Sequence, residues 1–250
     1  MLTTRIIVRL DVKSPQGVVK GRRMDGLRVV GGIAELASRA ELEGADEVLY
    51  VDVVASLMDK IANLDMIREC AEPLYTPLTV CGGIRSLEDV RKVLLAGADK
   101  VAINTAALKS PVLIMECARA FGSQAIVGSI EAKRVDDHWE CYMQGGREPS
   151  GWDVVEWAQS LEVLGAGEIL LTAVDKDGLA EGTDLECVKA VTQAVKVPVI
   201  ASGGIGTAQH VLDALDAGAD AVAIASLFYK HGVPGLKDEL SRAGVNVRWQ

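Results

Sequence analysis

The sequence predicts an α/β protein folded as a (β/α)8 barrel, and two observations lead to this prediction. Eight short runs rich in β-branched residues alternate with amphipathic stretches over the 250 residues, as in parallel sheets whose strands are joined by helices. The chain also repeats itself, because residues 76–106 align without gaps on residues 197–227 with 13 of 31 positions identical. We therefore expect a TIM barrel with a two-fold half-barrel repeat. The alternative is an open, doubly wound sheet, which is disfavoured because no GxGxxG motif follows the first run.

The predicted strands follow one another with room for one helix after each. In order, they are RIIVRLD (5–11), EVLYVDV (47–53), PLTVC (77–81), KVAIN (100–104), AIVGSIE (125–131), EILLTAV (168–174), PVIAS (198–202) and AVAIAS (221–226). Helical patterns such as SLEDVRKVLLAG and GWDVVEWAQSLEVLG lie between them. No Pro- or Ser-rich linker divides the chain. We therefore expect a single domain over 1–250, made of half-barrels at about 1–122 and 123–250.

The composition excludes several classes of function. The chain has 26 Lys and Arg against 35 Asp and Glu, a formal net charge of −9, so we expect no nucleic-acid partner, although a local basic pocket for a phosphorylated small molecule is compatible with this charge. No run approaches the roughly 18 apolar residues of a membrane span, and the N-terminal stretch has no secretory apolar segment. Five cysteines without CxxC spacing and three scattered histidines predict reduced thiols and no metal site. We expect a cytoplasmic protein with no membrane contact and no cofactor.

Glycine pairs at equivalent positions of the two halves predict two phosphate sites. CGGIRS (81–86) matches SGGIGT (202–207), and INTA (103–106) matches IASL (224–227). A strand that runs through Gly-Gly into a helix exposes backbone N–H groups near the positive end of the helix dipole, where anions bind. Turn glycines without a ligand are the alternative, but two matched pairs across one barrel mouth favour a substrate with a phosphate at each end. Lys20, in the flexible-looking stretch VKGRRMDG, could cover a phosphate as part of a lid, or lie in a solvated loop.

Two acidic residues end strands at equivalent places, Asp11 in the first half and Glu131 in the second. Carboxylates that face each other across a barrel mouth suit general acid and general base catalysis, whereas strand-end acids can also simply cap the next loop. Asp52, Asp175 and Asp177 lie in similar positions and could orient substrate hydroxyls.

Four charged residues begin predicted strands at the other end of the barrel: Arg5, Glu47, Lys100 and Glu168. Charges at strand starts usually face solvent. Two cations and two anions at one level could instead form a neutral ring that closes the bottom of the barrel, because an unpaired charge facing the axis would be costly.

Taken together, these segments resemble one known family, the cyclase subunit of imidazole glycerol phosphate synthase, HisF, of histidine biosynthesis. The resemblance runs from Arg5 to about Tyr229. A close sister family is the phosphoribosyl-formimino isomerase HisA, but the DKDGLAEGTDL loop and INTAA look like the cyclase. The segments that carry the resemblance are RIIVRLDVK, VVKG, GADEVLYVDV, PLTVCGGIRS, GADKVAINTAA, FGSQAIVGSIEAKR, GAGEILLTAVDKDG and PVIASGGIG.

The resemblance implies a TIM barrel that cyclises a bis-phosphate, nucleotide-like substrate with ammonia. The ammonia would come from a glutamine amidotransferase subunit docked at the strand N-terminal face and would travel along the barrel axis. It would convert the phosphoribulosyl-formimino aminoimidazole carboxamide ribotide to imidazole glycerol phosphate and the aminoimidazole carboxamide ribotide. Asp11 and Glu131 match the catalytic acids, and the ring of Arg5, Glu47, Lys100 and Glu168 matches the ammonia gate. The expected substrate- and phosphate-binding residues are Lys20, Gly82, Gly83, Asn104, Thr105, Thr172, Asp177, Gly178, Ser202, Gly203, Gly204 and Ser226.

Three positions depart from the family pattern. Glu131 stands where the family usually has Asp, Arg9 where it has Cys, and Cys81 where it has the first Gly of a GGG loop. The longer side chain of Glu131 displaces its carboxyl by about one bond length, and such errors can cost about 100-fold in rate. Arg9 points the same way along its strand as Asp11 and could favour the ionised carboxylate. Two alternatives to the cyclase follow: a paralogue that delivers ammonia to a different acceptor in surface-sugar biosynthesis, and a non-catalytic barrel that binds a nucleotide or activates a glutaminase.

Overall fold

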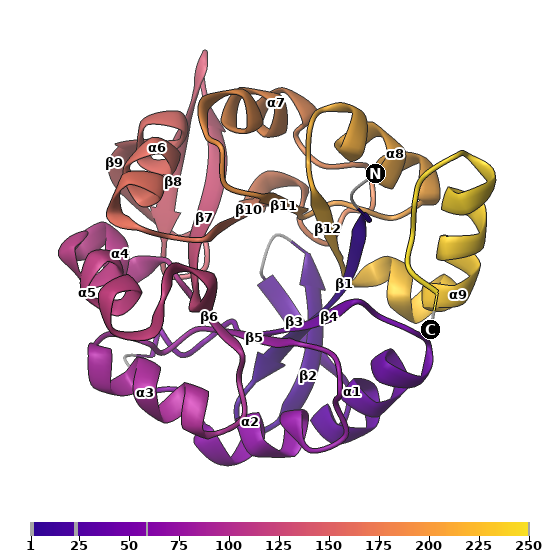
Figure 1. Ribbon diagram of the computed structural model, residues 1–250, viewed down its shortest axis with the longest axis horizontal. Coiled ribbons are helices and arrows are strands. Elements are labelled where there is room, and N and C mark those ends of the chain that lie inside the picture. The colour runs from indigo at the N-terminus through magenta and orange to yellow at the C-terminus, as the bar shows by residue number, and fades with distance from the viewer. Residues whose placement is uncertain (1–2, 23–24, 59, 250) are drawn as a thin grey trace.

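Eight parallel strands close into a barrel, and helices surround it (Figure 1). The structure, a computed structural model, describes residues 3–22, 25–58 and 60–249. The first strand, β1, pairs in parallel with β12 on one side and with β4 on the other, and the parallel pairing of β7 with β10 closes the barrel. The barrel strands are β1 (Arg5–Lys13), β4 (Glu47–Asp52), β5 (Leu78–Cys81), β6 (Lys100–Ile103), β7 (Ile126–Val135), β10 (Glu168–Ala173), β11 (Val199–Ser202) and β12 (Ala221–Ile224). This confirms the predicted (β/α)8 class, and each predicted strand is present.

Helices and two short 3₁₀ turns connect the strands on the outside of the barrel. They are α1 (Ile33–Leu42), α2 (Leu64–Ala71), α3 (Leu87–Leu95), α4 (Thr105–Lys109), α5 (Val112–Phe121), η1 (Ser123–Ala125), α6 (Val154–Leu164), η2 (Val174–Lys176), α7 (Leu185–Ala194), α8 (Ala208–Asp216) and α9 (Ser226–Arg242). No helix within the described residues is long and apolar enough to cross a membrane.

The internal repeat is visible in how two helices begin. Ser86 caps α3 by accepting a hydrogen bond from the N–H of Asp89, and Thr207 caps α8 in the same way from His210. The two caps have nearly the same extended backbone, with φ −145° and ψ 162° at Ser86 and φ −145° and ψ 163° at Thr207. A side-chain oxygen at this position satisfies a backbone N–H that the helix leaves free. The two halves therefore leave their glycine loops and enter the next helix by the same local geometry.

Alternation along each strand divides the apolar side chains into two layers. Ile6, Val8 and Leu10 of β1 belong to the main core between strands and helices, whereas Ile7 belongs to a separate cluster inside the barrel. Because side chains alternate along a strand, Arg5, Arg9 and Asp11 share the inward direction of Ile7. The interior cluster consists of Ile7, Leu49, Cys81, Ala102, Val127, Leu170, Ile200, Ala221 and Ala223. It separates a charged lower end from a charged mouth.

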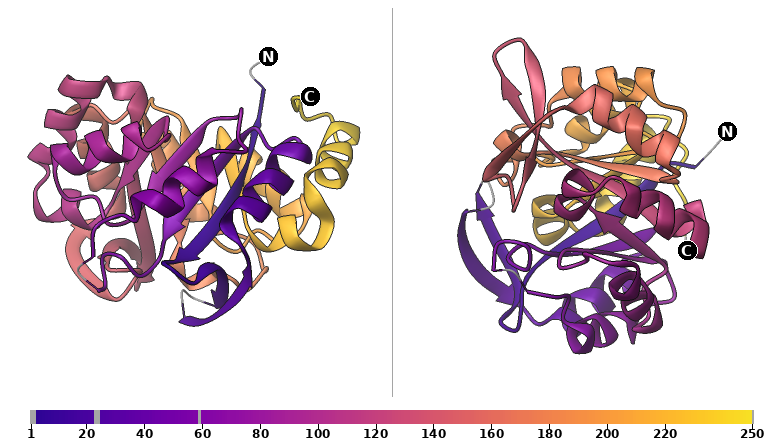
Figure 2. Two further views of the ribbon diagram at one scale, coloured as in Figure 1. Left: turned by 90° about the horizontal axis from the view of Figure 1, so that it is seen from below. Right: turned by 90° about the vertical axis from the view of Figure 1, so that its left-hand side faces the viewer.

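Two antiparallel additions extend the barrel and were not predicted. β1 continues past the predicted strand end and pairs with β2 (Gly17–Arg22), which pairs with β3 (Asp25–Gly31). The stretch around Lys20, expected as a flexible loop, is therefore largely strand; its residues 23–24 lie outside the described part. β7 likewise continues into a ribbon with β8 (His138–Met143) and β9 (Glu148–Asp153). Figure 2 shows β2 and β3 at the end of the barrel opposite the two termini, so this addition borders the mouth where the parallel strands end.

Candidate active site

Two cavities open at the mouth, and each is lined by one of the two glycine loops. The larger has a volume of about 280 Å³ and is lined by Gly82, Gly83, Asn104, Thr105 and Glu131, among others. The smaller has a volume of about 30 Å³. The predicted residues that line it are Asp11, Lys20, Asp177, Gly178, Ser202, Gly203, Gly204 and Ser226. The one remaining predicted residue, Thr172, lines neither cavity and is buried on β10, with Glu131 in register on one side and Ser202 on the other. The structure thus gathers the sequence-predicted residues into two groups joined by Thr172.

The first glycine of each pair occupies a position that only glycine fits. Gly82 has φ +103°, and a Cβ there would lie 2.5 Å from the carbonyl oxygen of Asp52. Gly203 has φ +89°, and a Cβ there would lie 2.6 Å from the carbonyl oxygen of Ala173. Any larger residue would strain the backbone and collide with the neighbouring strand end. Both loops therefore pass close to the preceding βα loop and leave their own backbone facing the cavity.

Asp11 lies beside a buried arginine. The Nε of Arg9 donates to Asp11 Oδ1 at 2.7 Å, as expected from their spacing along β1. Burial raises the pKa of Asp11, and the adjacent guanidinium of Arg9 opposes this rise. Lys20 approaches from β2, with its Nζ 5.2 Å from the centre of the Tyr229 ring. Burial and the nearby Lys230 lower the pKa of Lys20.

Arg9 connects three groups at the centre of the mouth. Its side chain is only 3% exposed. Besides Asp11, its Nη1 donates to Ser202 Oγ at 3.0 Å and lies 3.9 Å from Asp177 Oδ1. Its charge also acts on Glu131 across the barrel. The charge of Arg9 therefore acts on both candidate catalytic acids.

Glu131 accepts a hydrogen bond that the sequence did not predict. The backbone N–H of Gly146, in the loop between β8 and β9, donates to Glu131 Oε2 at 2.7 Å. Burial raises the pKa of Glu131 to about 7, against the lowering effect of this hydrogen bond and of Arg9. A carboxyl with this pKa exchanges its proton near neutral pH, which suits a general acid or base.

The end of β8 and the β8–β9 loop make further contacts with residues of the larger cavity. Asn104 donates from Nδ2 to the carbonyl oxygen of Tyr142 at 3.0 Å, and Thr105 Oγ1 accepts from the N–H of Gln144 at 3.1 Å. Asn104 Oδ1 is buried without a hydrogen-bond partner among the described residues. The sequence signal for this loop was the Gly145–Gly146 pair, but only the structure brings it to the site.

Two further predicted acids have different surroundings. Asp52 lines the larger cavity, accepts from the N–H groups of Val54 and Ala55, and has a pKa raised by burial. Asp175 lines neither of the two cavities and accepts from the N–H of Arg134 at 3.2 Å. Within the described residues, no group of three or more His, Cys, Asp or Glu side chains could hold a metal ion.

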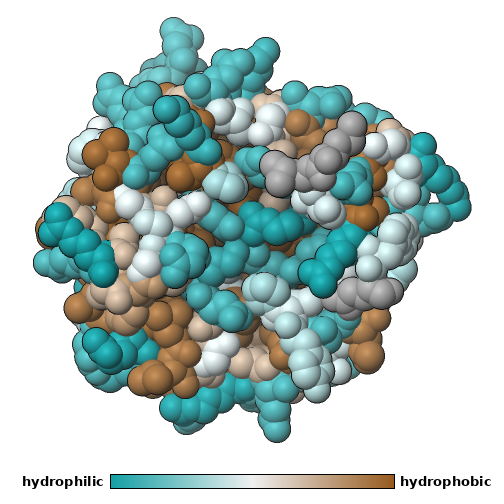
Figure 3. All heavy atoms as spheres, in the orientation of Figure 1, coloured by the Kyte–Doolittle hydropathy of each residue, from teal (hydrophilic) through white to brown (hydrophobic). Residues whose placement is uncertain are grey.

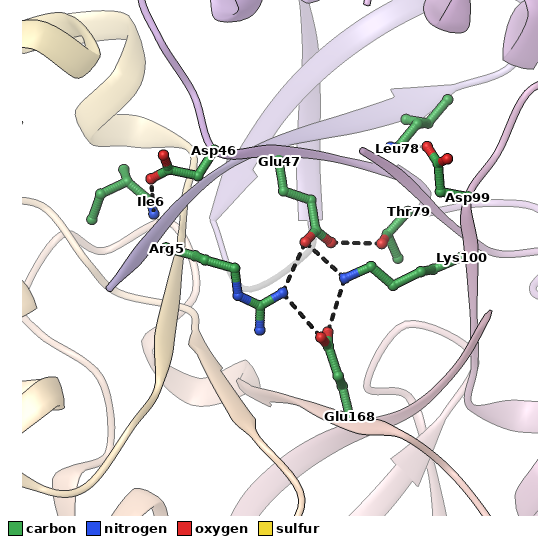
Figure 4. Close-up of polar contacts among 9 residues, drawn as sticks. All are labelled: Arg5, Ile6, Asp46, Glu47, Leu78, Thr79, Asp99, Lys100 and Glu168. Atoms are coloured by element: carbon green, nitrogen blue, oxygen red, sulfur yellow. Dashed lines mark hydrogen bonds and ion pairs between the residues drawn. The ribbon is translucent and has the colours of Figure 1, made fainter. Parts of the chain in front are cut away.

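At the opposite end of the barrel, four charged side chains form one closed ring (Figure 4). Arg5 donates to Glu47 and to Glu168 at 3.0 Å each. Lys100 donates to Glu47 at 2.8 Å and to Glu168 at 3.1 Å. Thr79 adds a hydrogen bond of 2.6 Å to Glu47, whose side chain is only 2% exposed. The four residues expected at one level are in mutual contact, and the ring carries no net charge.

Comparisons with known proteins agree with one another along almost the whole chain. Residues 5–234 match the family model described as histidine biosynthesis protein. The chain is 47% identical over 251 residues to a Myxococcus xanthus protein, covering 99% of each chain, and 46% identical over 250 residues to one from Thermococcus onnurineus, with the same coverage. A Metallosphaera sedula protein is 48% identical over 251 residues, which cover 99% of this chain and 100% of the relative. Each of the three is named imidazole glycerol phosphate synthase subunit HisF.

Proposed function

This chain belongs to the HisF family of histidine biosynthesis, the cyclase subunit of imidazole glycerol phosphate synthase, and on that premise we propose which of its residues carry out the reaction. The substrate is the phosphoribulosyl-formimino aminoimidazole carboxamide ribotide. The products are imidazole glycerol phosphate and the aminoimidazole carboxamide ribotide. The observation that carries the assignment of residues is the pair of cavities at the mouth, each with a glycine loop and each with one of the two candidate catalytic acids.

The two cavities bind the two phosphates of the substrate. The loop of Gly82 and Gly83 takes one phosphate, and the loop of Gly203 and Gly204 takes the other, because backbone N–H groups without side chains in the way are good anion ligands. Asn104 Oδ1, buried and unpaired within the described residues, is free to accept a hydrogen bond from the substrate. The molecule therefore lies across the mouth with its reacting centre between Asp11 and Glu131.

Asp11 and Glu131 divide the proton transfers. Addition of ammonia to the ketose carbonyl requires a base to take a proton from nitrogen and an acid to protonate the oxygen that leaves as water. Asp11, hydrogen-bonded to the Arg9 guanidinium, is suited to act as the base. Glu131, whose pKa is about 7, can hold a proton at neutral pH and is suited to act as the acid.

Ammonia enters from a glutamine amidotransferase subunit docked where the barrel strands begin. Four large apolar or aromatic side chains on this face, Leu42, Tyr75, Leu95 and Val163, are between 80% and 97% exposed. They come just before β4, β5, β6 and β10. Figure 3 views the molecule from this end and shows hydrophilic side chains at its centre with hydrophobic patches toward the rim. Exposed apolar side chains around a polar centre are typical of a docking surface, and the ring of Arg5, Glu47, Lys100 and Glu168 lies at the point where ammonia would enter. We place the complex in the cytoplasm.

The deciding experiment is turnover of the phosphoribulosyl-formimino substrate by the purified protein with an ammonium salt and no partner. We expect consumption of the substrate with equimolar release of both products. An Asp11→Asn preparation, purified identically, excludes a contaminating cyclase. Absence of turnover by the wild-type protein would contradict the proposal.

One feature favours a second candidate, delivery of ammonia to another acceptor. Arg9 fills the centre of the mouth beside Asp11 and Ser202 and is absent from the family pattern. The same assay separates the two functions, because a delivery barrel leaves the phosphoribulosyl substrate intact while still stimulating glutamine hydrolysis by a bound glutaminase.

A further inference from the structure

The smaller cavity has an unusual balance of charge for a phosphate site. Its lining contains two carboxylates, Asp11 and Asp177, and two cations, Arg9 and Lys20. Without Arg9 the lining would carry a net negative charge and would repel a phosphate ester. Lys20 alone could not offset both acids, and burial together with Lys230 already disfavours its charged form.

Arg9 is tied to the glycine loop of this cavity. Its Nη1 donates to Ser202 Oγ at 3.0 Å, and Ser202 directly precedes Gly203 and Gly204 in the chain. The guanidinium has five N–H groups, and its Nη2 makes no hydrogen bond with the described residues. Because the side chain is 3% exposed and lines the cavity, it is held in place before any ligand arrives. A buried, oriented guanidinium with free donors fits the geometry of a phosphate oxygen pair.

We propose that Arg9 is a direct ligand of the phosphate in the smaller cavity and a specificity-determining residue of this barrel. The inference rests on the proposed function for the identity of the substrate, a bis-phosphate ester. Arg9 neutralises Asp11 and Asp177 and donates a hydrogen bond to the phosphate at that end, so the smaller cavity binds anions through a side chain as well as through its backbone. The larger cavity has no such buried cation among the described residues that line it, because its Arg85 and Lys109 are exposed. The two ends of the substrate are therefore held differently.

Inorganic phosphate tests this proposal without any turnover. Wild-type crystals soaked in phosphate should show density at Gly82–Gly83 and at Gly203–Gly204, and calorimetry should detect two sites. Arg9→Gln should lose the density at Gly203–Gly204 and weaken that site by about ten- to a hundred-fold, as expected for loss of a charge-assisted hydrogen bond. The density at Gly82–Gly83 serves as an internal control and should persist.

Two more variants show whether Arg9 binds the phosphate directly or only neutralises the nearby acids. They also guard against the possibility that Arg9→Gln alone misfolds. The double variant Arg9→Gln with Asp177→Asn removes one charge of each sign, so the net charge of the cavity is kept while the guanidinium is lost. If Arg9 is a direct ligand, phosphate binding at Gly203–Gly204 should remain as weak in the double variant as in Arg9→Gln. Arg9→Lys keeps the cation but loses the planar pair of donors, so it should bind phosphate at this site more weakly than the wild type and more tightly than Arg9→Gln. Wild-type affinity and density at both loops in the double variant would overturn the proposal.

The outcome is independent of the assay for the proposed function. If Arg9→Gln loses the second phosphate site while the wild-type protein leaves the phosphoribulosyl substrate intact, the proposed reaction fails and the role of Arg9 stands. If the wild-type protein turns over the substrate and Arg9→Gln binds both phosphates normally, the proposed reaction stands and the role of Arg9 as a phosphate ligand fails.

Discussion

Glu47 and Glu168 share both of their cations, since each accepts one hydrogen bond from Arg5 and one from Lys100. Neither carboxylate can leave the ring without breaking two charged contacts, and loss of either cation leaves two acids that share a single cation. This reciprocity makes the four side chains one closed network, and it gives the first prediction.

Lys100→Ala should impair glutamine-dependent turnover more than ammonium-dependent turnover. Loss of the cation leaves Glu47 and Glu168 held only by Arg5, so the entrance to the axis changes while the mouth does not. We expect ammonium-dependent kcat within about twofold of wild type and a stability loss of about 2 kcal/mol. Lys92→Ala, which removes an exposed lysine that pairs with Glu88 on α3, is the matched control. Equal effects on both nitrogen sources would mean that the ring is structural only.

Asp11→Asn should abolish most of the activity with little effect on substrate binding. The amide cannot accept a proton from ammonia, so kcat should fall by about 10²- to 10⁴-fold. The KM should stay within tenfold because the lost interaction belongs mainly to the transition state. Steady-state kinetics with saturating ammonium salt measure both constants. A large rise in KM with kcat unchanged would instead assign Asp11 to binding.

Glu131 should make stability depend on pH between its two pKa values. In the unfolded chain this carboxyl ionises near 4.5, and in the folded protein near 7. The folded state therefore binds the extra proton in this interval, so the free energy of unfolding falls as pH rises from 4.5 to 7 and then levels off. The loss is about 3 kcal/mol at most. Denaturant titrations of wild type and Glu131→Gln should show that the variant lacks this slope, and parallel slopes would refute the assignment.

The same group should also control the alkaline side of the activity profile. If protonated Glu131 donates to the leaving oxygen, kcat should decline above a pH of about 7 when rates are normalised to the concentration of unprotonated ammonia.

Glu131→Asp, which restores the family residue, should raise kcat on the phosphoribulosyl substrate. No gain from this change, with a fully active wild type, would show that the longer side chain already reaches the substrate.

Leu95→Asp should weaken docking of the glutaminase. The change places a carboxylate on a side chain that is 80% exposed at the face where the strands begin, and it should raise the Kd by about ten- to a hundred-fold if Leu95 is buried on docking. Met58→Asp is the matched control, because Met58 is also an exposed apolar residue but follows β4 at the mouth. Calorimetric titration of each variant with the glutaminase partner measures the change in Kd. Similar losses in both variants would place the docking surface elsewhere.

The barrel strands could be predicted because their apolar runs are buried on both faces and leave few alternatives. Asp11 and Glu131 could be found for a related reason, since parallel strands all end at one face. The hairpins β2–β3 and β8–β9 could not, because their short strands gain stability from pairing with extensions of β1 and β7 rather than from their own pattern. The contact between Gly146 and Glu131 depends on such an extension and was therefore missed. The unequal volumes of the two cavities also could not be predicted, since a cavity volume depends on how all of its lining side chains pack.

The apolar cluster inside the barrel separates the proton-exchanging groups at its two ends. Its nine side chains, from Ile7 to Ala223, contain neither oxygen nor nitrogen, so this layer supplies few groups that could pass a proton from one end to the other. Under the proposed function, ammonia would cross the layer as a neutral molecule. Asp11 and Glu131 are therefore left to exchange protons at the mouth, with the substrate and with solvent, rather than with the ring at the other end of the barrel.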